Sequence, residues 1–565
     1  MEVGPRVRVT ADLHNVASGR RVEGVMAEGP ADSLLHLVDR LSVDVARALL
    51  ARQNPDLTGI RISSITTPSP AALRAFMEGE AQYRRSQFEA ALEAYQRAVD
   101  LDPGFALAHF RIASALNWAS LPGELDARAK AYGNRDRLPA REALMIEAEY
   151  LARRGALPSG IALLREGVRR YPDDPEIWYQ LGDAYLHWGP QLKLTPSDAQ
   201  RALERAVELD PDFVPYHIHL VDLALIEGDS AKAAERLETE RRLAGKETLQ
   251  LRAHQLQFDY LYGSEDDRVR VVEALEDADV VLLSRLRRPW THDGEKAGEA
   301  LRLARLACEE TRERGDMTSG VVYDCLYIQL ASGRIDQARE WISSRVQSPD
   351  AIPFGPATLA NLVMRQTGLY LHAPSEAEVT VPTLREEHVG VVQPDLVMSA
   401  LLALDQGRVA VTDSTLVILE RQADSAAAAQ DTLDARLIHG LVEGIRGYRA
   451  LSRQREDEAL EHLTVSERLL AGSVGPEGAF WTQVVWPLAE IQARRGNERE
   501  AIQLYRSLWW SLYSSPAFLR RIDFHDRLGE EARADSLRRH FLHLWADGDS
   551  DHPFIQQVRR GLPPG

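Results

Sequence analysis

The sequence predicts a mainly α-helical protein, a solenoid of antiparallel helix pairs that follows a small N-terminal α/β element. Three observations carry this prediction. Residues 72–103 contain two amphipathic stretches joined by a short turn, similar pairs recur about every 34 residues, and residues 7–28 alternate in the manner of a β-hairpin. Because a helix pair buries its apolar face only against neighbouring pairs, such a chain grows by repetition.

The first 66 residues differ from the rest of the chain. Val7 and Val9 begin an alternating stretch, residues 17–20 form a turn, and a second alternating stretch follows. Residues 32–51 then have the apolar spacing of one amphipathic helix. A lone hairpin leaves strand edges unpaired, so we expect it to dock on the first repeat, pair with another chain, or fray.

Residues 72–103 show how one helix pair is built. Ala91, Tyr95 and Ala98 recur at helical spacing and predict a buried stripe on the second helix. Gly79 is small, which predicts a close approach of the two helices at that point. Pro103 lies where the second helix must end.

The repeat length carries a family resemblance. Gly155 and Gly189 are 34 residues apart, and Gly189 and Gly228 are 39 apart because the turn GPQLKLTPSDAQ holds an insertion. With this period, the stretch PEIWYQLGDAYLHWG and the helix end RALERAVELDP resemble the tetratricopeptide repeat (TPR). The resemblance covers residues 70–246 in five repeats and implies a TPR α-solenoid. The second repeat departs from the pattern after Ala115.

Beyond residue 246 the repeats decay without vanishing. A turn glycine followed five residues later by alanine recurs, as in Gly333 with Ala338 and Gly496 with Ala501. We therefore expect degenerate helical repeats over 247–347 and a second degenerate TPR-like array over 394–565. Residues 348–393 are rich in proline and β-branched residues, which predicts an irregular connection with a possible strand near 379–392.

The order of these segments resembles a large bacterial family. The stretch VRVTADLHNVASGRRVEGVMAEGPADSLLHLVDRLSVDVARALL is similar to the last part of a TolB-amino-terminal-like α/β domain, truncated here, and GNRDRLPAREALMIEAEYLARRG and LRRHFLHLWADGDSDHPFIQQVRRGL resemble that family's repeats. The family comprises C-terminal regions of serine/threonine kinases, adenylate cyclases and winged-helix regulators. The resemblance implies a sensory or scaffolding region in bacterial signalling. The chain is then a stand-alone derivative, has a start codon placed late, or is a fragment.

Composition and missing motifs exclude several functions. A net charge of −18 argues against binding to duplex nucleic acid. We find no nucleotide-binding, zinc-protease, kinase or serine-hydrolase motif, so we expect no enzyme activity and no cofactor. No apolar run is long enough to span a membrane, and no signal peptide is visible. The chain as it stands is expected to be cytoplasmic, and an extracytoplasmic location remains open for a fragment of a membrane-anchored regulator.

Weaker signals are interpreted as structural. His540, His543 and Asp547 could share a helical face as metal ligands, but we favour a solvated face. Cys308 and Cys325 are expected to be separate thiols in the core or on the surface. A calcium loop beginning at Asp547 fails for lack of its glycine and closing glutamate, His217 and His219 are assigned to repeat packing and surface, and Trp509 and Trp510 to packing at an array end.

The positive functional signal is the concave face that the first helices of a stacked array would line. Aromatic and acidic side chains turned away from the small packing residues should point into it. The groove candidates are Phe76, Glu80, Tyr83, Phe110, Asn117, Glu149, Tyr179, Asp183 and Asp222. An acidic, aromatic groove favours a basic or amphipathic peptide. The first hypothesis is therefore a protein-binding scaffold, and the alternative is a ligand-sensing regulatory region of a kinase or cyclase whose catalytic domain is not in this chain. The oligomeric state is left open.

Overall fold

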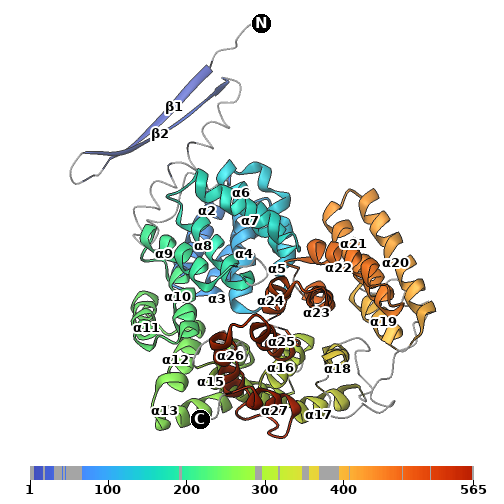
Figure 1. The fold of residues 1–565 in the computed structure, drawn as a ribbon. Coiled ribbons are helices and arrows are strands. Elements are labelled where there is room, and N and C mark those ends of the chain that lie inside the picture. The colour runs from blue at the N-terminus through green and yellow to red at the C-terminus, as the bar shows by residue number, and fades with distance from the viewer. Residues whose placement is uncertain are drawn as a thin grey trace.

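The computed structural model is mainly helical and forms a TPR-type solenoid, which confirms the predicted fold class (Figure 1). It describes residues 6–14, 16, 20–30, 41, 45, 67–189, 194–286, 296–315, 318–346, 356–367, 369, 393–405, 407–473, 475–508 and 511–562. Within these ranges, helices pack against one another in antiparallel pairs. Strands β1 and β2 form the one sheet of the described residues.

The predicted hairpin is present. Strand β1 (Arg6–His14) pairs antiparallel with β2 (Arg21–Pro30), with Val9 opposite Ala27 and an irregularity at the end next to the turn. The hairpin projects away from the helices in Figure 1. The helix expected over residues 32–51 lies outside the described residues, except that Leu41 and Val45 are helical.

The first array contains five helix pairs, as the repeat pattern predicts. Its helices are α2 (Pro70–Tyr83), α3 (Phe88–Leu101), α4 (Ala106–Ala119), α5 (Glu124–Gly133), α6 (Ala140–Arg153), α7 (Leu157–Arg170), α8 (Pro175–Trp188), α9 (Pro196–Leu209), α10 (Val214–Glu227) and α11 (Ser230–Ala244). The second pair has a short helix, α5, followed by a 3-10 turn at Arg135–Arg137. This is the local consequence of its atypical sequence.

Local residues explain where these helices begin, turn and touch. Ser69 and Asp174 cap α2 and α8 with side chains that accept hydrogen bonds from the first turn. Ser86 turns the chain between α2 and α3 with a left-handed φ of 57°. A Cβ on Gly79 would lie 2.5 Å from the ring of Tyr95, so the predicted close approach is confirmed.

The remaining helices continue the antiparallel packing. They are α12 (Leu249–Tyr262), α13 (Glu265–Glu276), α14 (Val280–Leu286), α15 (Ala297–Glu313), α16 (Ser319–Ala331), α17 (Ile335–Val346), α18 (Pro356–Thr367), α19 (Gln393–Asp405), α20 (Val409–Ala428), α21 (Thr432–Ser452), α22 (Glu456–Leu470), α23 (Gly475–Arg494), α24 (Glu498–Ser507), α25 (Ser514–Arg527), α26 (Glu531–Leu544) and α27 (Pro553–Arg560). Helix α18 corrects the expectation that all of 348–393 is irregular. The strand expected at 379–392 and Trp509 and Trp510 lie outside the described residues.

The C-terminal helices return to the middle of the chain. Arg302 on α15 makes two hydrogen bonds to Asp547, at 2.7 and 2.9 Å, and Ser515 on α25 donates to the carbonyl of Leu330. Buried residues from Ala297 to Val558 form one continuous hydrophobic cluster. The helices on the two sides of residues 348–393 therefore share a core, although their sequences suggest two separate arrays.

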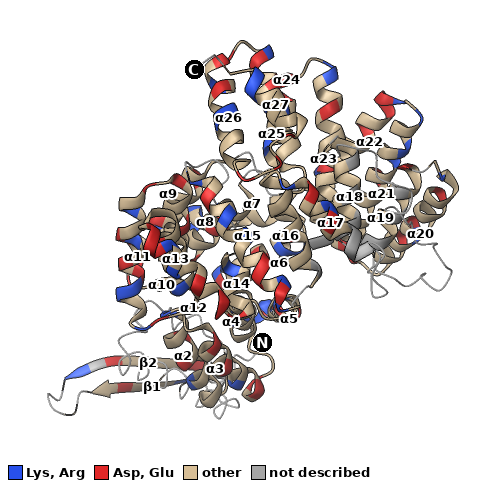
Figure 2. Cartoon of the chain, turned by 90° about the horizontal axis from the view of Figure 1, so that it is seen from below, with Lys and Arg blue, Asp and Glu red and all other residues tan. Residues whose placement is uncertain are grey.

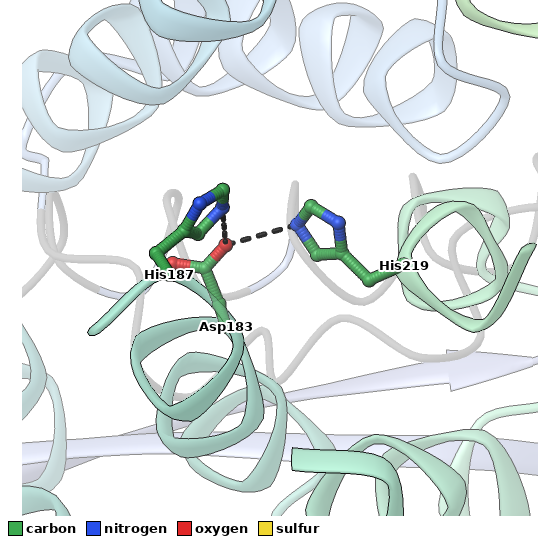
Figure 3. A group of neighbouring side chains, drawn as sticks. All are labelled: Asp183, His187 and His219. Atoms are coloured by element: carbon green, nitrogen blue, oxygen red, sulfur yellow. Dashed lines mark hydrogen bonds and ion pairs between the residues drawn. The ribbon is translucent and has the colours of Figure 1, made fainter. Parts of the chain in front are cut away.

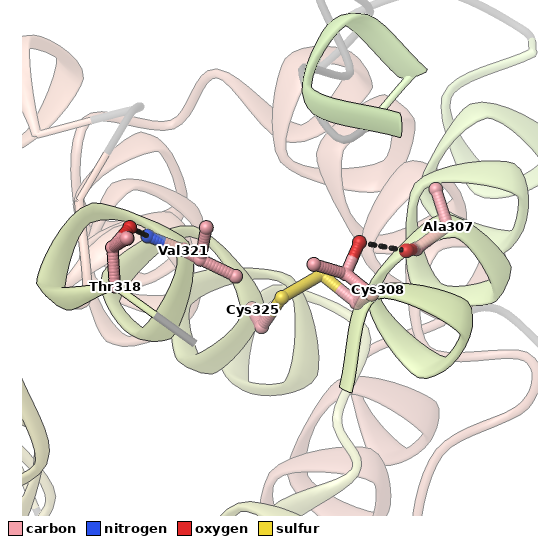
Figure 4. The surroundings of a disulfide bond; sticks show 6 residues. Ala307, Cys308, Thr318, Val321 and Cys325 are labelled. Carbon is pink, nitrogen blue, oxygen red and sulfur yellow. Dashed lines mark hydrogen bonds between the residues drawn. A yellow bond between two sulfur atoms is a disulfide. The ribbon is translucent and has the colours of Figure 1, made fainter. Parts of the chain in front are cut away.

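The two cysteines form a disulfide, so the expectation of separate thiols is wrong. Cys308 on α15 and Cys325 on α16 are both fully buried, with Cα atoms 5.7 Å apart (Figure 4). The antiparallel packing of α15 and α16 brings the two cysteines within the range of Cα distances that a disulfide requires. The bond closes a loop of 17 residues and joins neighbouring helices.

Candidate functional site

On the inner face of the first array, the end of the first helix, α2, contacts the segment between α9 and α10. At the end of α2, Arg84 makes two hydrogen bonds to Asp210, at 2.8 and 2.9 Å, and its carbonyl accepts a hydrogen bond from the amide of Val214 at 3.0 Å. The Tyr83 ring lies 6.0 Å from the ring of Phe213. Helix α2 therefore touches the turn before α10, and these contacts fill the space between them.

Three of the aromatic groove candidates are buried in the hydrophobic core of the first array. Phe76, Tyr83 and Phe110 are each less than 5% exposed. Phe76 packs between Tyr95 and Phe105. The expectation that these rings are exposed to a ligand is therefore wrong, because all three pack into the core that the stacked helices share.

The acidic candidates Glu80 and Glu149 are neutralised by cations of the array. Glu80 is buried and accepts hydrogen bonds from the Tyr95 hydroxyl at 2.5 Å and from Arg111 at 2.7 Å. Glu149 forms an ion pair with the buried guanidinium of Arg128. A carboxylate paired in this way contributes little field at the surface, so these two residues do not supply the acidic attraction expected of them.

The other two acidic candidates, Asp183 and Asp222, belong to a line of alternating carboxylates and imidazoles. His219 on α10 contacts Asp183 of α8 through Nε2 and Asp222 through Nδ1, each at 2.9 Å. Asp183 also lies 3.3 Å from Nε2 of His187, one turn further along α8. Figure 3 shows the side chains of Asp183, His187 and His219 pointing toward one another from two helices.

The line continues into the next repeat through His254 on α12. The Nε2 atom of His254 lies 3.1 Å from Asp222, and its Nδ1 atom lies 2.7 Å from Glu240 on α11. His254 and Glu240 are completely buried. Three repeats are therefore joined by charged groups in their interior, an arrangement that is stable only while each charge keeps its partners.

Burial and pairing act in opposite directions on these groups. Burial alone would lower the pKa of His219, but hydrogen bonds to Asp183 and Asp222 raise it to about 9. Burial likewise opposes protonation of His254, yet the charge of Glu240 and the bond to Asp222 raise its pKa to about 10. The same contacts hold the pKa of Asp222 below its usual range against the effect of burial. Both imidazoles are therefore charged at neutral pH.

The last two candidates differ in their exposure. Asn117 is exposed at the end of α4. Tyr179 is half-buried and packs against Tyr216, with ring centres 4.9 Å apart, and against His219. Of the nine candidates, those with accessible surface are Asn117, Glu149, Tyr179 and Asp183.

The structure adds a partly open cleft of about 280 Å³ that sequence reasoning missed. Phe88 and Trp118 lie parallel at its base with ring centres 5.1 Å apart, and Arg285 lies over the Trp118 ring. Its remaining lining residues are Ser86, Gln87, Glu89, Ala90, Lys246, Glu247, Thr248, Leu249 and Gln250. They come from the α2–α3 and α11–α12 turns, far apart in sequence, and no local pattern links the two turns.

The C-terminal metal candidates do not come together. His543 contacts Glu299 at 3.0 Å, Asp547 binds Arg302, and the His540 ring lies against Phe518. The histidines of the first array were the stronger signal. Asp183 and His187 are four residues apart on one helix, and His219 and His254 are 35 residues apart, about one repeat.

Comparisons with known proteins identify the class of the repeats. Models of the families described as TPR repeat and tetratricopeptide repeat match residues 79–116 and 141–184. The chain therefore contains TPR repeats, and repeats of this class are generally non-catalytic and serve protein–protein interaction. No curated protein sequence matches the chain.

The solved structures that align with the chain are distant. PilW, a widely conserved type IV pilus biogenesis factor, is 14% identical with a TM-score of 0.26, over 38% of this chain and 98% of PilW. PilF of Pseudomonas aeruginosa is 17% identical with a TM-score of 0.24, over 38% of this chain and 96% of PilF. The APC/C hetero-tetramer Cut9-Hcn1 aligns over 87% of this chain and 96% of the matched chain, at 12% identity and a TM-score of 0.25.

None of the helices in the described part of the chain combines the length and the apolar composition that crossing a membrane requires. Figure 2 shows basic and acidic residues on the same helices, for example on α11 and α13.

Proposed function

We propose that this protein is a non-catalytic scaffold that binds a protein segment on the first repeat array, with the cleft beside Trp118 as the anchoring site. The observation that carries the proposal is this cleft within TPR repeats: it offers two stacked aromatic rings at its base and charged side chains at its rim. Binding energy at protein interfaces concentrates where an anchor side chain enters such a pocket.

The proposed partner segment is basic and is not nucleic acid. Glu89 and Glu247 line the cleft and are exposed. Lys246 and Arg285 also line the cleft, so a segment with both a cation and an apolar side chain fits this rim better than a purely basic one. The net charge of −18 favours the encounter with a cationic partner.

The setting we propose is bacterial signalling, in a region like those that follow a TolB-amino-terminal-like domain in kinases and cyclases, with that domain truncated in this chain. The hairpin β1–β2 ahead of TPR repeats supports this order of segments. The buried Cys308–Cys325 disulfide supports an oxidising, extracytoplasmic compartment over the cytoplasm, where thiols are kept reduced.

A second candidate function is the sensing of a small ligand, which the cleft itself favours. Its volume of about 280 Å³ is close to the lower end of small-molecule sites. A thermal-shift screen of metabolites distinguishes the two functions. A small compound that raises the melting temperature of the wild-type chain, and not that of a Trp118→Ala variant, favours sensing.

The scaffold proposal is tested by selecting peptides from a random phage-displayed library on the full chain. We expect enriched peptides with basic and apolar residues, and an affinity that falls with added salt. The double variant Glu89→Lys/Glu247→Lys should weaken their binding about tenfold, because both side chains are exposed and their reversal repels a cation. Reversal of the exposed Glu461 on α22 is the matched control and should have no effect.

Two results would contradict the proposal. Enrichment of acidic peptides would exclude the basic partner. Enriched peptides that bind the double variant as tightly as the wild type would show that the cleft is not the binding surface.

A further inference from the structure

Asp183, His187 and His219 bring three metal-ligand atoms together on the inner face. Asp183 and His187 are one turn apart on α8 and share a face, while His219 comes from α10 in the next repeat. One oxygen of Asp183 lies 3.3 Å from Nε2 of His187 and 2.9 Å from Nε2 of His219, and the three ligand atoms lie within 4.8 Å of one another. Tetrahedral zinc with nitrogen and oxygen ligands needs about 3.4 Å between ligand atoms.

The imidazole of His219 is held in the orientation that a metal ligand needs. Its Nδ1 atom lies 2.9 Å from Asp222, which accepts a hydrogen bond from Nδ1–H, and Nε2 is directed at Asp183. A metal ion would take the place of the proton on Nε2. The ring lies between Trp118 and Tyr179, with ring centres at 5.3 and 6.1 Å. A carboxylate behind a ligating histidine fixes its tautomer and raises its basicity, and Asp222 occupies that position.

The cluster is open on one side. The side chains of Asp183 and His187 are 22% and 26% exposed, whereas that of His219 is 4% exposed. An ion can therefore reach the two ligands on α8 from solvent and complete its coordination with the buried one. Three protein ligands leave a fourth tetrahedral position for water or for a donor group of a bound partner.

We propose that Asp183, His187 and His219 form a binding site for a divalent transition metal, with Zn²⁺ as the best match, and that Asp222 orients His219. Two imidazoles and one carboxylate suit zinc, while magnesium and calcium prefer oxygen ligands alone. The metal would join α8 to α10 and present one exchangeable position on the inner face. The His219 ring lies against Trp118, which also lines the proposed peptide-binding cleft, but none of the three ligands lines that cleft. The metal proposal therefore stands whether or not a peptide binds.

The test is a titration of the chelator-treated full chain with Zn²⁺ by isothermal calorimetry, with bound metal counted by mass spectrometry after dialysis. We expect one Zn²⁺ per chain, and a Co²⁺ derivative with the visible absorption of a tetrahedral complex. His187→Gln removes a ligand that is partly exposed, so the fold should persist and the affinity should fall by roughly 100-fold or more. Asp222→Asn should lower it by about 10- to 100-fold, the effect of losing an outer-shell partner.

The matched control is His462→Gln. The His462 side chain is 25% exposed and hydrogen-bonds one carboxylate, Glu443, on the separate helices α22 and α21. This variant should bind Zn²⁺ as the wild type does, and circular dichroism should show all variants folded. Failure of the wild type to bind one Zn²⁺ would overturn the proposal and leave the cluster as an internal ion pair. Equal affinities of wild type and His187→Gln would overturn it too, since the metal would lie elsewhere.

Discussion

Replacing Asp222 by Asn removes the charge that two buried imidazoles share. Asp222 accepts hydrogen bonds from His219 at 2.9 Å and His254 at 3.1 Å, and it is 3% exposed. An asparagine has the same shape as the aspartate, but its amide has one acceptor oxygen, which serves one imidazole ring. Its NH2 group, a donor, then faces the other ring. One imidazole N–H is then left facing another donor in the interior.

The expected loss of stability follows from these contacts. Each hydrogen bond to a charged group contributes about 1.5–3 kcal/mol, and removal of one partner from a buried ion pair costs about 3–5 kcal/mol. His219 keeps its contact with Asp183, and His254 keeps its contact with Glu240. We therefore expect the lower end of the range, about 3 kcal/mol, which is roughly 100-fold in the local opening equilibrium.

Hydrogen exchange followed by mass spectrometry measures that opening without requiring the whole chain to unfold in one step. Peptides from α8 to α12 in the metal-free chain at pH 7 should exchange roughly 100-fold faster in Asp222→Asn. Asp173→Asn is the control, because Asp173 is 81% exposed, lies 3.4 Å from Arg205 and should change exchange hardly at all. A change below about fivefold in Asp222→Asn would refute the reasoning that these charges stabilise the repeats.

Three further predictions concern packing, pH and the disulfide. Gly182→Ala should destabilise the first array by about 1–3 kcal/mol, since its Cβ would lie 2.6 Å from the Leu203 side chain. Gly320→Ala is the control and should not destabilise the protein, because its Cβ would lie in open space. Equal melting temperatures of the two variants would contradict this prediction. His219 and His254 have folded pKa values of about 9 and about 10, above the unfolded value of 6.5, so their contribution is complete below pH 6.5 and is lost as the pH rises through 9 to 10. A melting temperature that stays constant from pH 6 to 10.5 in the metal-free chain would disprove it. Cys308→Ala should lower stability by about 3 kcal/mol, the value for a loop of 17 residues, and a reductant should lower the melting temperature of the wild type but not of the variant.

The repeat units themselves were predictable because their information is local. Gly79 stands where the two helices of a pair approach each other, and the structure confirms this contact, with Tyr95. Gly182 makes a similar close approach to Leu203 in the fourth pair. The glycine-to-alanine spacing in the degenerate repeats also holds: Gly333 has a left-handed φ of 73°. Helix period, turn residues and small contact residues all act within one repeat length, so a single sequence displays them.

The binding face was predicted less well, because its exposure depends on the pitch of the whole array. Phe110 has the helical position of an inward-pointing residue, but it is buried in the core of the stacked helices. Tyr83 lies beside Phe213, where Arg84 and Asp210 join the ends of α2 and α9. The pairing of Glu80 with Arg111 has the same origin. Partners from different repeats reach each other only after the repeats have stacked with a particular curvature.

The sequence by itself determined the class of fold, the first helix pair with its turn, the hairpin and the absence of familiar catalytic motifs. Tertiary structure alone decided that Cys308 bonds to Cys325, that α25–α27 pack on the middle of the chain, and that Asp183, His187 and His219 meet. The physical reason is distance along the chain. Secondary structure responds to neighbours within a few residues, while burial, ion pairing and ligand geometry depend on side chains that only the packing of separate helices brings together.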